Sequence, residues 1–294
     1  MNDLVDQEKA EFALTLPGQI HYIEFKLLLK PHLFTDESAY HKFWKRAHHV
    51  TKQLGVGFSK PEKSDSLIRE VVLYDTPHFK LYDAGFILRK RTFFKHGQPE
   101  PNFELTIRFR DPDPEVVAAV DMRPLLPCIH TIKFKEEILQ LNDALGGARS
   151  LFVHGCELDT PNIILTQRFE VIAQVFPALQ HARTANPKAS LAVVNDVTVE
   201  ETLVHLGELD FGSKLIAKAS IALWRNRATG DDIIGEFGYQ LKFDHPEDLR
   251  HKARDLAITF FKNLQQEARE WVQLGTTKTS LIYGMGHQSV RHHE

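Results

Sequence analysis

The sequence predicts an α+β protein in which helices pack outside a large antiparallel β-sheet or barrel. Two observations carry this prediction. Several segments alternate apolar and polar residues with a period of two, and fewer segments show the three- and four-residue spacing of an amphipathic helix. The chain has 294 residues, of which 43% are hydrophobic, so it is long enough to bury a sizeable core.

Four segments show the period-two alternation most clearly. They are 22–27, 103–110, 131–135 and 236–243. Side chains on a strand point to opposite faces in turn, so each of these segments has one apolar and one polar, mostly charged face. Further strands are predicted at 70–74, 86–93, 168–171, 191–199, 202–210 and 217–224.

Three segments have helical spacing. They are 36–54, 137–145 and 246–274. Thr35 or Asp36 can cap the first of these helices. The last is the clearest helix, with Pro246 in its first turn and Gly275 at its end. The resulting order is strand, helix, several strands, helix, several strands and a final helix.

Composition narrows the functional class. The formal net charge is −3, whereas a protein that coats nucleic acid is usually basic overall. Two cysteines are too few for a disulfide scaffold and fit a reducing cytosol. The polar segment 1–11 does not resemble a signal peptide, and no apolar run approaches the roughly 20 residues that span a bilayer. We therefore expect a cytoplasmic protein with no membrane partner and no DNA partner.

The polar strand faces carry many charges of both signs, and two interpretations compete. In the first, these faces simply contact water, as on an antiparallel sheet with one exposed side. In the second, they line the inside of a wide barrel. Convergent Lys and Arg would then bind a polyanion, and Glu residues among them could hold Mg²⁺ or Mn²⁺. The alternation alone is compatible with both.

A resemblance favours the second interpretation. The run 72–77 (VLYDTP), followed by 81–91 (LYDAGFILRKR), resembles the CYTH superfamily, whose members are also called triphosphate tunnel metalloenzymes. The segments 24–26 (EFK) and 104–108 (ELTIR) are similar to two further strand motifs of that superfamily. Glu236 opens what resembles its late Glu-x-Glu strand, and 278–283 (KTSLIY) is similar to the tail of longer members.

This resemblance implies a closed antiparallel barrel whose charged lumen binds a triphosphate together with Mg²⁺ or Mn²⁺. The phosphate-binding residues that it implies are Lys26, Arg89, Arg91, Arg108, Lys133, Lys135, Arg168 and Lys218. The metal-binding residues that it implies are Glu24, Glu104 and Glu236. No general base stands out. Residues 21–294 would form one tunnel domain that includes the 246–274 helix, preceded by an N-terminal extension, 1–20.

The chain also departs from the superfamily pattern at three acidic positions. Tyr22, Trp224 and Gly238 stand where carboxylates are usual, and Glu208 with Asp210 could substitute for them. Loss of several carboxylates weakens a metal site.

The leading hypothesis is metal-dependent hydrolysis of an inorganic or organic triphosphate. The alternatives are non-catalytic binding of polyphosphate, a nucleotide or another phosphorylated ligand, and class IV-type adenylate cyclisation. A barrel that binds an unrelated small molecule would need an apolar lumen.

Overall fold

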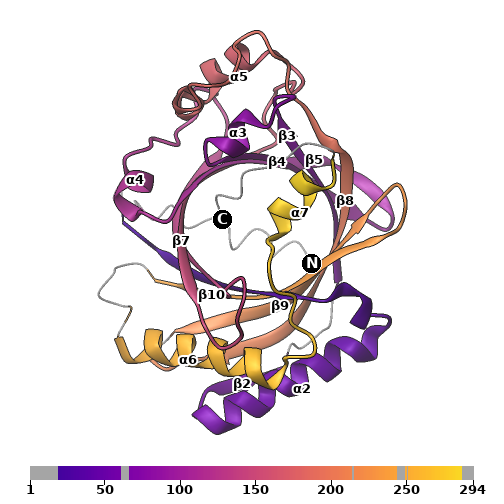
Figure 1. Cartoon of the computed structure of the whole chain (residues 1–294), viewed down its shortest axis with the longest axis vertical. Coiled ribbons are helices and arrows are strands. Elements are labelled where there is room, and N and C mark those ends of the chain that lie inside the picture. The colour runs from indigo at the N-terminus through magenta and orange to yellow at the C-terminus, as the bar shows by residue number, and fades with distance from the viewer. Residues whose placement is uncertain (1–18, 61–65, 214, 244–248, 250, 287–294) are drawn as a thin grey trace.

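The computed structural model describes residues 19–60, 66–213, 215–243, 249 and 251–286 (Figure 1). Its strands are β1 (Tyr22–Leu29), β2 (Gly57–Ser59), β3 (Ser66–Asp75), β4 (Phe86–Lys95), β5 (Gln98–Asp111), β6 (His130–Leu139), β7 (Arg149–Asp159), β8 (Ala192–Asp210), β9 (Ile216–Asn226) and β10 (Asp232–Lys242). Its helical elements are η1 (Pro31–Leu33), α2 (Glu37–Leu54), α3 (Lys80–Asp83), α4 (Pro114–Ala118), α5 (Phe169–Val175), η2 (Pro177–His181), α6 (His251–Glu267) and α7 (Lys278–Gly284).

The strands close into a barrel. Within the described ranges, ten strands form one sheet in the order β2-β8-β3-β4-β5-β7-β6-β1-β10-β9, and β8 also pairs with β9. All strands but β2 therefore form a closed ring, which Figure 1 shows nearly end-on. The predicted barrel with helices outside is confirmed. Its neighbouring strands are antiparallel as predicted, apart from β1 and β6, which are parallel.

Two long helices cover one outer side of the barrel. The helix α2 begins after Asp36, one of the two capping residues that the sequence offers, and its carboxylate accepts a hydrogen bond from Ser38 N at 2.7 Å. Phe43 of α2 packs on Phe237 of β10, with ring centroids 5.2 Å apart. Phe261 of α6 packs on Phe25 of β1 in the same buried cluster. The outward faces of these strands are therefore the apolar ones, which leaves the charged faces directed inward.

A second apolar cluster covers the outside of β4, β5 and β7. It includes Val117 of α4, Phe169 and Ile172 of α5, and Leu179 of η2. No helix in the described ranges is long and apolar enough to cross a membrane.

Several predicted elements differ from the structure. The segment 137–145 is not a helix, because β6 continues to Leu139. The segment 168–171 is not a strand, because α5 begins at Phe169. The strand β7 was not predicted. The segments 191–199 and 202–210 are one strand, β8.

The final helix is shorter than predicted. Its Pro246 lies outside the described residues, and α6 ends at Glu267 rather than continuing to 274. The chain leaves the helix because Val272 forms a bridge with Leu29 of β1, and Lys30 N donates to the carbonyl of Trp271 at 2.8 Å. The indole of Trp271 also packs edge-on against Phe34, with ring centroids 5.1 Å apart. Extended pairing with β1 and aromatic packing thus replace the last helical turns.

Candidate functional site

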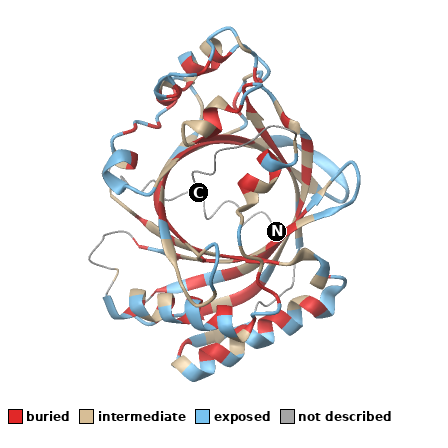
Figure 2. Cartoon of the chain, in the orientation of Figure 1, coloured by how far each residue is buried: buried red, intermediate tan, exposed pale blue. Residues whose placement is uncertain are grey.

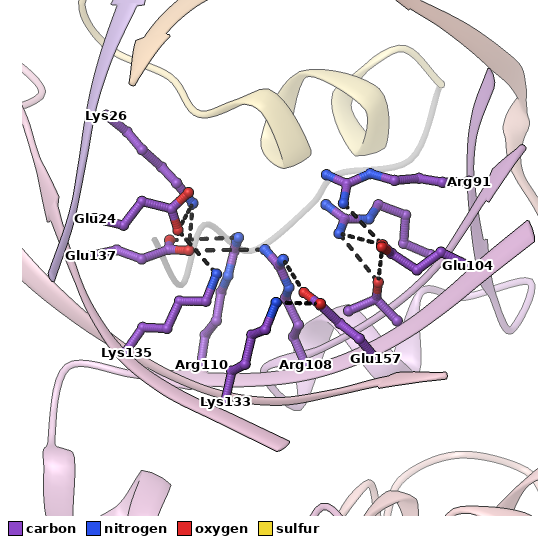
Figure 3. A network of polar contacts seen from close by, with 12 residues as sticks. Glu24, Lys26, Arg91, Glu104, Arg108, Arg110, Lys133, Lys135, Glu137 and Glu157 are labelled. Carbon is purple, nitrogen blue, oxygen red and sulfur yellow. Dashed lines mark hydrogen bonds and ion pairs between the residues drawn. The ribbon is translucent and has the colours of Figure 1, made fainter. Parts of the chain in front are cut away.

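One half of the barrel interior is filled with charged side chains, and we call it the charged half (Figure 3). These residues alternate along their strands with outward apolar residues, as period-two geometry requires. Within the described chain, the basic members are Lys26, Arg69, Arg89, Arg91, Arg108, Arg110, Lys133, Lys135 and Lys278. The acidic members are Glu24, Glu104, Glu137, Glu157, Glu201 and Glu236. Nine cationic groups against six carboxylates leave an excess of positive charge.

The strands β1 and β6 supply one corner of the charged half. Their parallel register places Glu24 beside Glu137. Lys26 Nζ lies 3.5 Å from Glu24 Oε2 and forms a short ion pair with Glu137 Oε1. Lys135 Nζ donates to Glu24 Oε2 at 3.3 Å. Two carboxylates and two ammonium groups thus alternate in this corner.

Arg108 connects this corner to β7. Its guanidinium lies 4.0 Å from Glu137 Oε1 and 3.7 Å from Glu157 Oε1. The side chain crosses over Gly155, which pairs in register with both Arg108 and Lys133. A Cβ atom at position 155 would lie 3.1 Å from Arg108 Cγ, so the glycine leaves room for the arginine. Lys133 Nζ completes the group by donating to Glu157 Oε2 at 2.5 Å.

A second group of charges lies on β3, β4, β5 and β8. Arg91 Nη1 donates to Glu104 Oε1 at 3.0 Å, and Arg89 Nη2 lies 3.7 Å from the same oxygen. Arg69 donates two hydrogen bonds to the buried carboxylate of Glu201. The Nε atoms of Arg89 and Arg91 are buried and make no hydrogen bond within the described residues. These guanidinium groups therefore keep unused donors inside the barrel.

The ionic network shifts the pKa of its members. Burial alone would raise the pKa of Glu137, but Lys26 and Arg110 lower it to about 2. Burial likewise opposes ionisation of Glu24, and Lys135, Lys26 and Arg108 together hold its pKa well below the ordinary value. Burial lowers the pKa of Lys135 to about 8, even though Glu24 favours its charged form. Glu24 and Glu137 are therefore ionised at neutral pH, and they balance part of the positive charge around them.

The other half of the barrel interior is apolar, and we call it the plugged half. On the inward faces, Leu28 follows Lys26 on β1, and Val71 and Leu73 follow Arg69 on β3. The short helix α7 lies across this end of the barrel, unlike the long helices α2 and α6, which lie outside (Figure 1). Figure 2 shows the buried residues of α7 within the ring of strands. Its side chains Ile282 and Tyr283 join the inward apolar residues in one buried cluster.

Polar contacts fix α7 in this position. Tyr283 stacks on Tyr82 with ring centroids 4.0 Å apart, and its hydroxyl donates to Asp75 Oδ2 at 3.0 Å. Asn195 Nδ2 donates to the carbonyl oxygens of Ile282 and Tyr283. At the start of α7, Lys278 Nζ lies 2.6 Å from Glu236 Oε1 and 4.9 Å from the ring centroid of Trp224. The helix α7 thus contributes one cation, Lys278, to the charged half.

The structure brings most of the predicted phosphate-binding residues together and leaves two apart. Lys26, Arg89, Arg91, Arg108, Lys133 and Lys135 all lie in the charged half. Arg168 precedes α5 outside the barrel, where its side chain is 56% exposed and lies 3.0 Å from Glu170. Lys218 lies on the inward face of β9, because Ala217 and Ala219 on either side of it join the outer apolar cluster. It is exposed, however, and its register partners are Gln240 and Glu208 rather than members of the charged half. Asp210, the other suggested substitute, is exposed and accepts a hydrogen bond from Gly212 N.

Other residues of the charged half were missed by the sequence analysis. They are Arg69, Arg110, Glu137, Glu157, Glu201 and Lys278. Alternation could have identified both Arg110, which lies on the polar face of 103–110, and Glu137, which continues the polar face of 131–135 by one step. Glu157 lies on the unpredicted strand β7, and Lys278 lies in the tail that resembles longer superfamily members.

The three predicted metal-binding carboxylates do not converge. Glu24 contacts Lys26 and Lys135, Glu104 contacts arginines on β4, and Glu236 contacts Lys278 of α7. Among the described residues, no group of three or more His, Cys, Asp or Glu side chains is placed to hold a metal ion. Mg²⁺ and Mn²⁺ need several oxygen ligands around one point. The carboxylates of this barrel fit ammonium and guanidinium partners rather than a resident metal ion.

The three non-acidic positions noted in the sequence face the barrel interior. Tyr22 pairs in register with Lys135, whose ammonium lies 6.0 Å from the ring centroid. Gly238 pairs with Lys26. Trp224 is buried in the apolar cluster of the plugged half, so it helps to close that end of the barrel.

Comparisons with known proteins are limited to solved structures, because no family model and no curated protein sequence matches the chain. A putative adenylyl cyclase from Hippeastrum, described as having a dominant triphosphatase activity, is 12% identical. The match covers 90% of this chain and 96% of that chain with a TM-score of 0.41. A putative adenylate cyclase from Bacillus halodurans is 13% identical over 89% of this chain and 96% of that chain, with a TM-score of 0.36. A putative adenylate cyclase from Vibrio parahaemolyticus is 13% identical, and the match covers 90% of this chain and 98% of that chain with a TM-score of 0.33.

Proposed function

We propose that the chain is a divergent member of the CYTH superfamily that binds a triphosphate-bearing small molecule or polyphosphate inside its barrel and hydrolyses a terminal phosphoryl group. The observation that carries this proposal is the excess of inward Lys and Arg groups over carboxylates in a closed barrel. Guanidinium groups make forked contacts to phosphate oxygens, and ammonium groups add point charges. We also expect the protein to act in the cytosol, because its low cysteine content is typical of a reducing compartment.

The chemistry needs little beyond positioning and charge. Water attacks the terminal phosphorus, the bond from that phosphorus to the bridging oxygen breaks, and the remaining chain leaves with the electron pair. The proton that the water loses passes to a phosphate oxygen of the products or to solvent. Negative charge spreads over the equatorial oxygens in the transition state, where fixed cations stabilise it. Arg108 and Lys135 are held in place by Glu157 and Glu24 before any ligand arrives. Preorganised cations of this kind reduce the reorganisation required during the reaction.

Non-catalytic binding of the same ligands is the second candidate. The observation that favours it is the dispersal of the three carboxylates expected to hold metal. In addition, the low pKa of Glu137 makes its carboxylate a weak base. A binding protein would use the same basic groups and would release no phosphate.

The decisive experiment measures phosphate release from tripolyphosphate, thiamine triphosphate and ATP, each with Mg²⁺, Mn²⁺ or EDTA. Cyclic AMP is measured in parallel in the ATP samples. Release by the wild-type chain that is lost in a Lys26→Ala/Arg89→Ala variant supports hydrolysis inside the barrel. Cyclic AMP instead of phosphate would identify a cyclase.

Lys90→Ala is the matched control. Lys90 lies between Arg89 and Arg91 in sequence, but its ammonium packs over the ring of Phe103, 4.7 Å from the centroid, on the outer face. We expect this variant to retain wild-type release. If the folded wild-type chain releases no phosphate but binds tripolyphosphate, the second candidate replaces hydrolysis. If it does neither, the proposed function is wrong.

A further inference from the structure

The carboxylates of the charged half already have cations. Glu24 and Glu137, which are register partners on β1 and β6, both contact Lys26 Nζ, so an ammonium group occupies the place between them that a shared metal ion would take. Glu157 is held between Lys133 and Arg108, and Glu201 accepts two hydrogen bonds from Arg69. Each carboxylate therefore acts as a counter-ion to a side chain that could bind phosphate.

Electrostatics explains why these carboxylates are present. Nine cations crowded in one buried volume repel one another, and burial itself penalises each charge. Arg89 shows this cost, since burial, Arg91 and Arg108 lower its pKa well below the ordinary value. Interleaved carboxylates offset the repulsion while the barrel is empty of ligand. A phosphate chain carries oxygens with the same charge and can take over the same partners.

We propose that the carboxylates of the charged half are internal counter-ions rather than metal ligands, and that a phosphate chain binds by replacing them on Lys and Arg, without a divalent cation. This inference rests on the proposed function, because it assumes that the barrel interior is the phosphate site. The preferred ligand is the metal-free polyanion. Mg²⁺ lowers the charge of tripolyphosphate in solution, so it competes with the protein for the ligand.

The test is calorimetric titration of the full chain with tripolyphosphate, first with EDTA and then with excess Mg²⁺. We expect binding in EDTA, and affinity that is at least threefold weaker in Mg²⁺. Binding that requires Mg²⁺ would overturn this inference and leave the proposed function standing. Absence of binding in both conditions would overturn the two together.

A pair of variants tests the role of Glu137 independently, because a counter-ion and a metal ligand at this position predict opposite changes in tripolyphosphate affinity. Glu137→Gln keeps the side-chain shape but removes one negative charge that competes with the ligand, so we expect about tenfold tighter binding in EDTA. A metal ligand at this position would instead show weaker binding in Mg²⁺. Glu136→Gln is the matched control. Glu136 is the adjacent residue of β6, but its carboxylate pairs with Arg254 and Ser150 on the outer face, and we expect unchanged affinity. Circular dichroism establishes that both variants are folded.

Discussion

The two halves of the barrel interior are built on the same strands but are filled differently. Apolar side chains pack together in one half, and charged side chains form ion pairs in the other. In the plugged half, Leu28, Trp224 and the α7 residue Tyr283 form one buried cluster that needs no ligand. In the charged half, Lys26 and Arg108 are balanced by carboxylates, and a net positive charge remains. The chain thus combines a fully packed apolar core and an ionic site inside one barrel.

This difference shows how stability and binding can be separated along one barrel. Burial of apolar side chains stabilises the folded state directly. A whole buried ion pair contributes little net stability because desolvation opposes its attraction, although removal of one partner alone leaves an unpaired buried charge and is destabilising. We therefore expect substitutions in the plugged half to lower the free energy of unfolding, and substitutions in the charged half to change ligand affinity.

The largest expected effect is on stability and comes from Tyr283→Ala. The side chain is completely buried, and its loss would leave a cavity and an unfilled hydrogen bond at Asp75. Truncation of a buried aromatic residue costs about 3–5 kcal/mol. Urea denaturation measures this loss. Met285→Ala, at the exposed end of α7, is the control and should change the free energy of unfolding by less than about 0.5 kcal/mol. A loss below about 1 kcal/mol for Tyr283→Ala would mean that α7 is not an integral part of the barrel.

The next effect is on affinity. Arg108→Ala removes a guanidinium whose side chain is only 10% exposed and which lies between the carboxylates of Glu137 and Glu157. Loss of a desolvated charge contact costs on the order of 2–5 kcal/mol, so tripolyphosphate affinity should fall by about 100-fold, as measured by calorimetry. Arg168→Ala is the matched control outside the barrel. Equal losses from the two variants would show that the ligand does not bind in the charged half.

The pH dependence of binding gives a smaller effect. The pKa of Lys135 is about 8, mainly because burial disfavours the charged ammonium. Binding of an anion requires that charge, so affinity should fall as pH rises above 8, by about tenfold per pH unit at most. Tripolyphosphate itself titrates, so the quantity to measure is the affinity of wild type divided by that of Lys135→Arg. A ratio that is constant between pH 7 and pH 9.5 would contradict the role of Lys135.

The same shift affects stability with the opposite sign. The folded-state pKa of Lys135 lies below the ordinary value of about 10.4 for an unfolded chain. The unfolded state therefore binds more protons between pH 8 and pH 10. The contribution of this residue to the free energy of unfolding should rise with pH across that window.

The sequence predicted the parts of this comparison that depend on local pattern. Alternation along 22–27 and 103–110 predicted Lys26 and Arg108 on charged faces, because the period of two is a property of a single strand. The pattern could not show that these faces point inward, because that depends on closure of the sheet between β8 and β9. The resemblance to a known superfamily supplied that inference.

Other residues were missed for identifiable reasons. Glu137 lies in a run rich in Glu and Leu, which favours a helix, but pairing with β1 and β7 keeps it in a strand. Glu157 lies on β7, where Gly155 interrupts the alternation in order to admit Arg108. Arg168 was placed on a predicted strand, 168–171, whereas Phe169 and Ile172 belong to α5 and pack on the outer surface. In each case tertiary packing overrode a local preference.

The smallest expected effect is on stability and comes from Tyr283→Phe, which isolates the hydrogen bond between α7 and Asp75 from the packing of the ring. Tyr283→Phe keeps the ring but removes the hydroxyl that donates to Asp75, which still accepts hydrogen bonds from the backbone of Thr76, Leu81 and Tyr82. We expect a loss of about 1 kcal/mol in the free energy of unfolding at pH 7.5. Tyr40→Phe, on the outer helix α2, is the control.

The pH dependence of this variant identifies the bond that is lost. Burial raises the pKa of Asp75 to about 6, above the value of an unfolded chain, so the folded state binds the additional proton between about pH 4 and pH 6. The ionised carboxylate is the stronger acceptor, and removal of its Tyr283 donor raises the pKa further. Because the pKa of Asp75 is higher in Tyr283→Phe than in wild type, the difference in the free energy of unfolding should be fully present well above pH 6. It should shrink as pH falls toward 6 and stay constant below that. A difference that is independent of pH would show that the Tyr283 hydroxyl does not favour the ionised form of Asp75, and the loss could not then be assigned to this hydrogen bond.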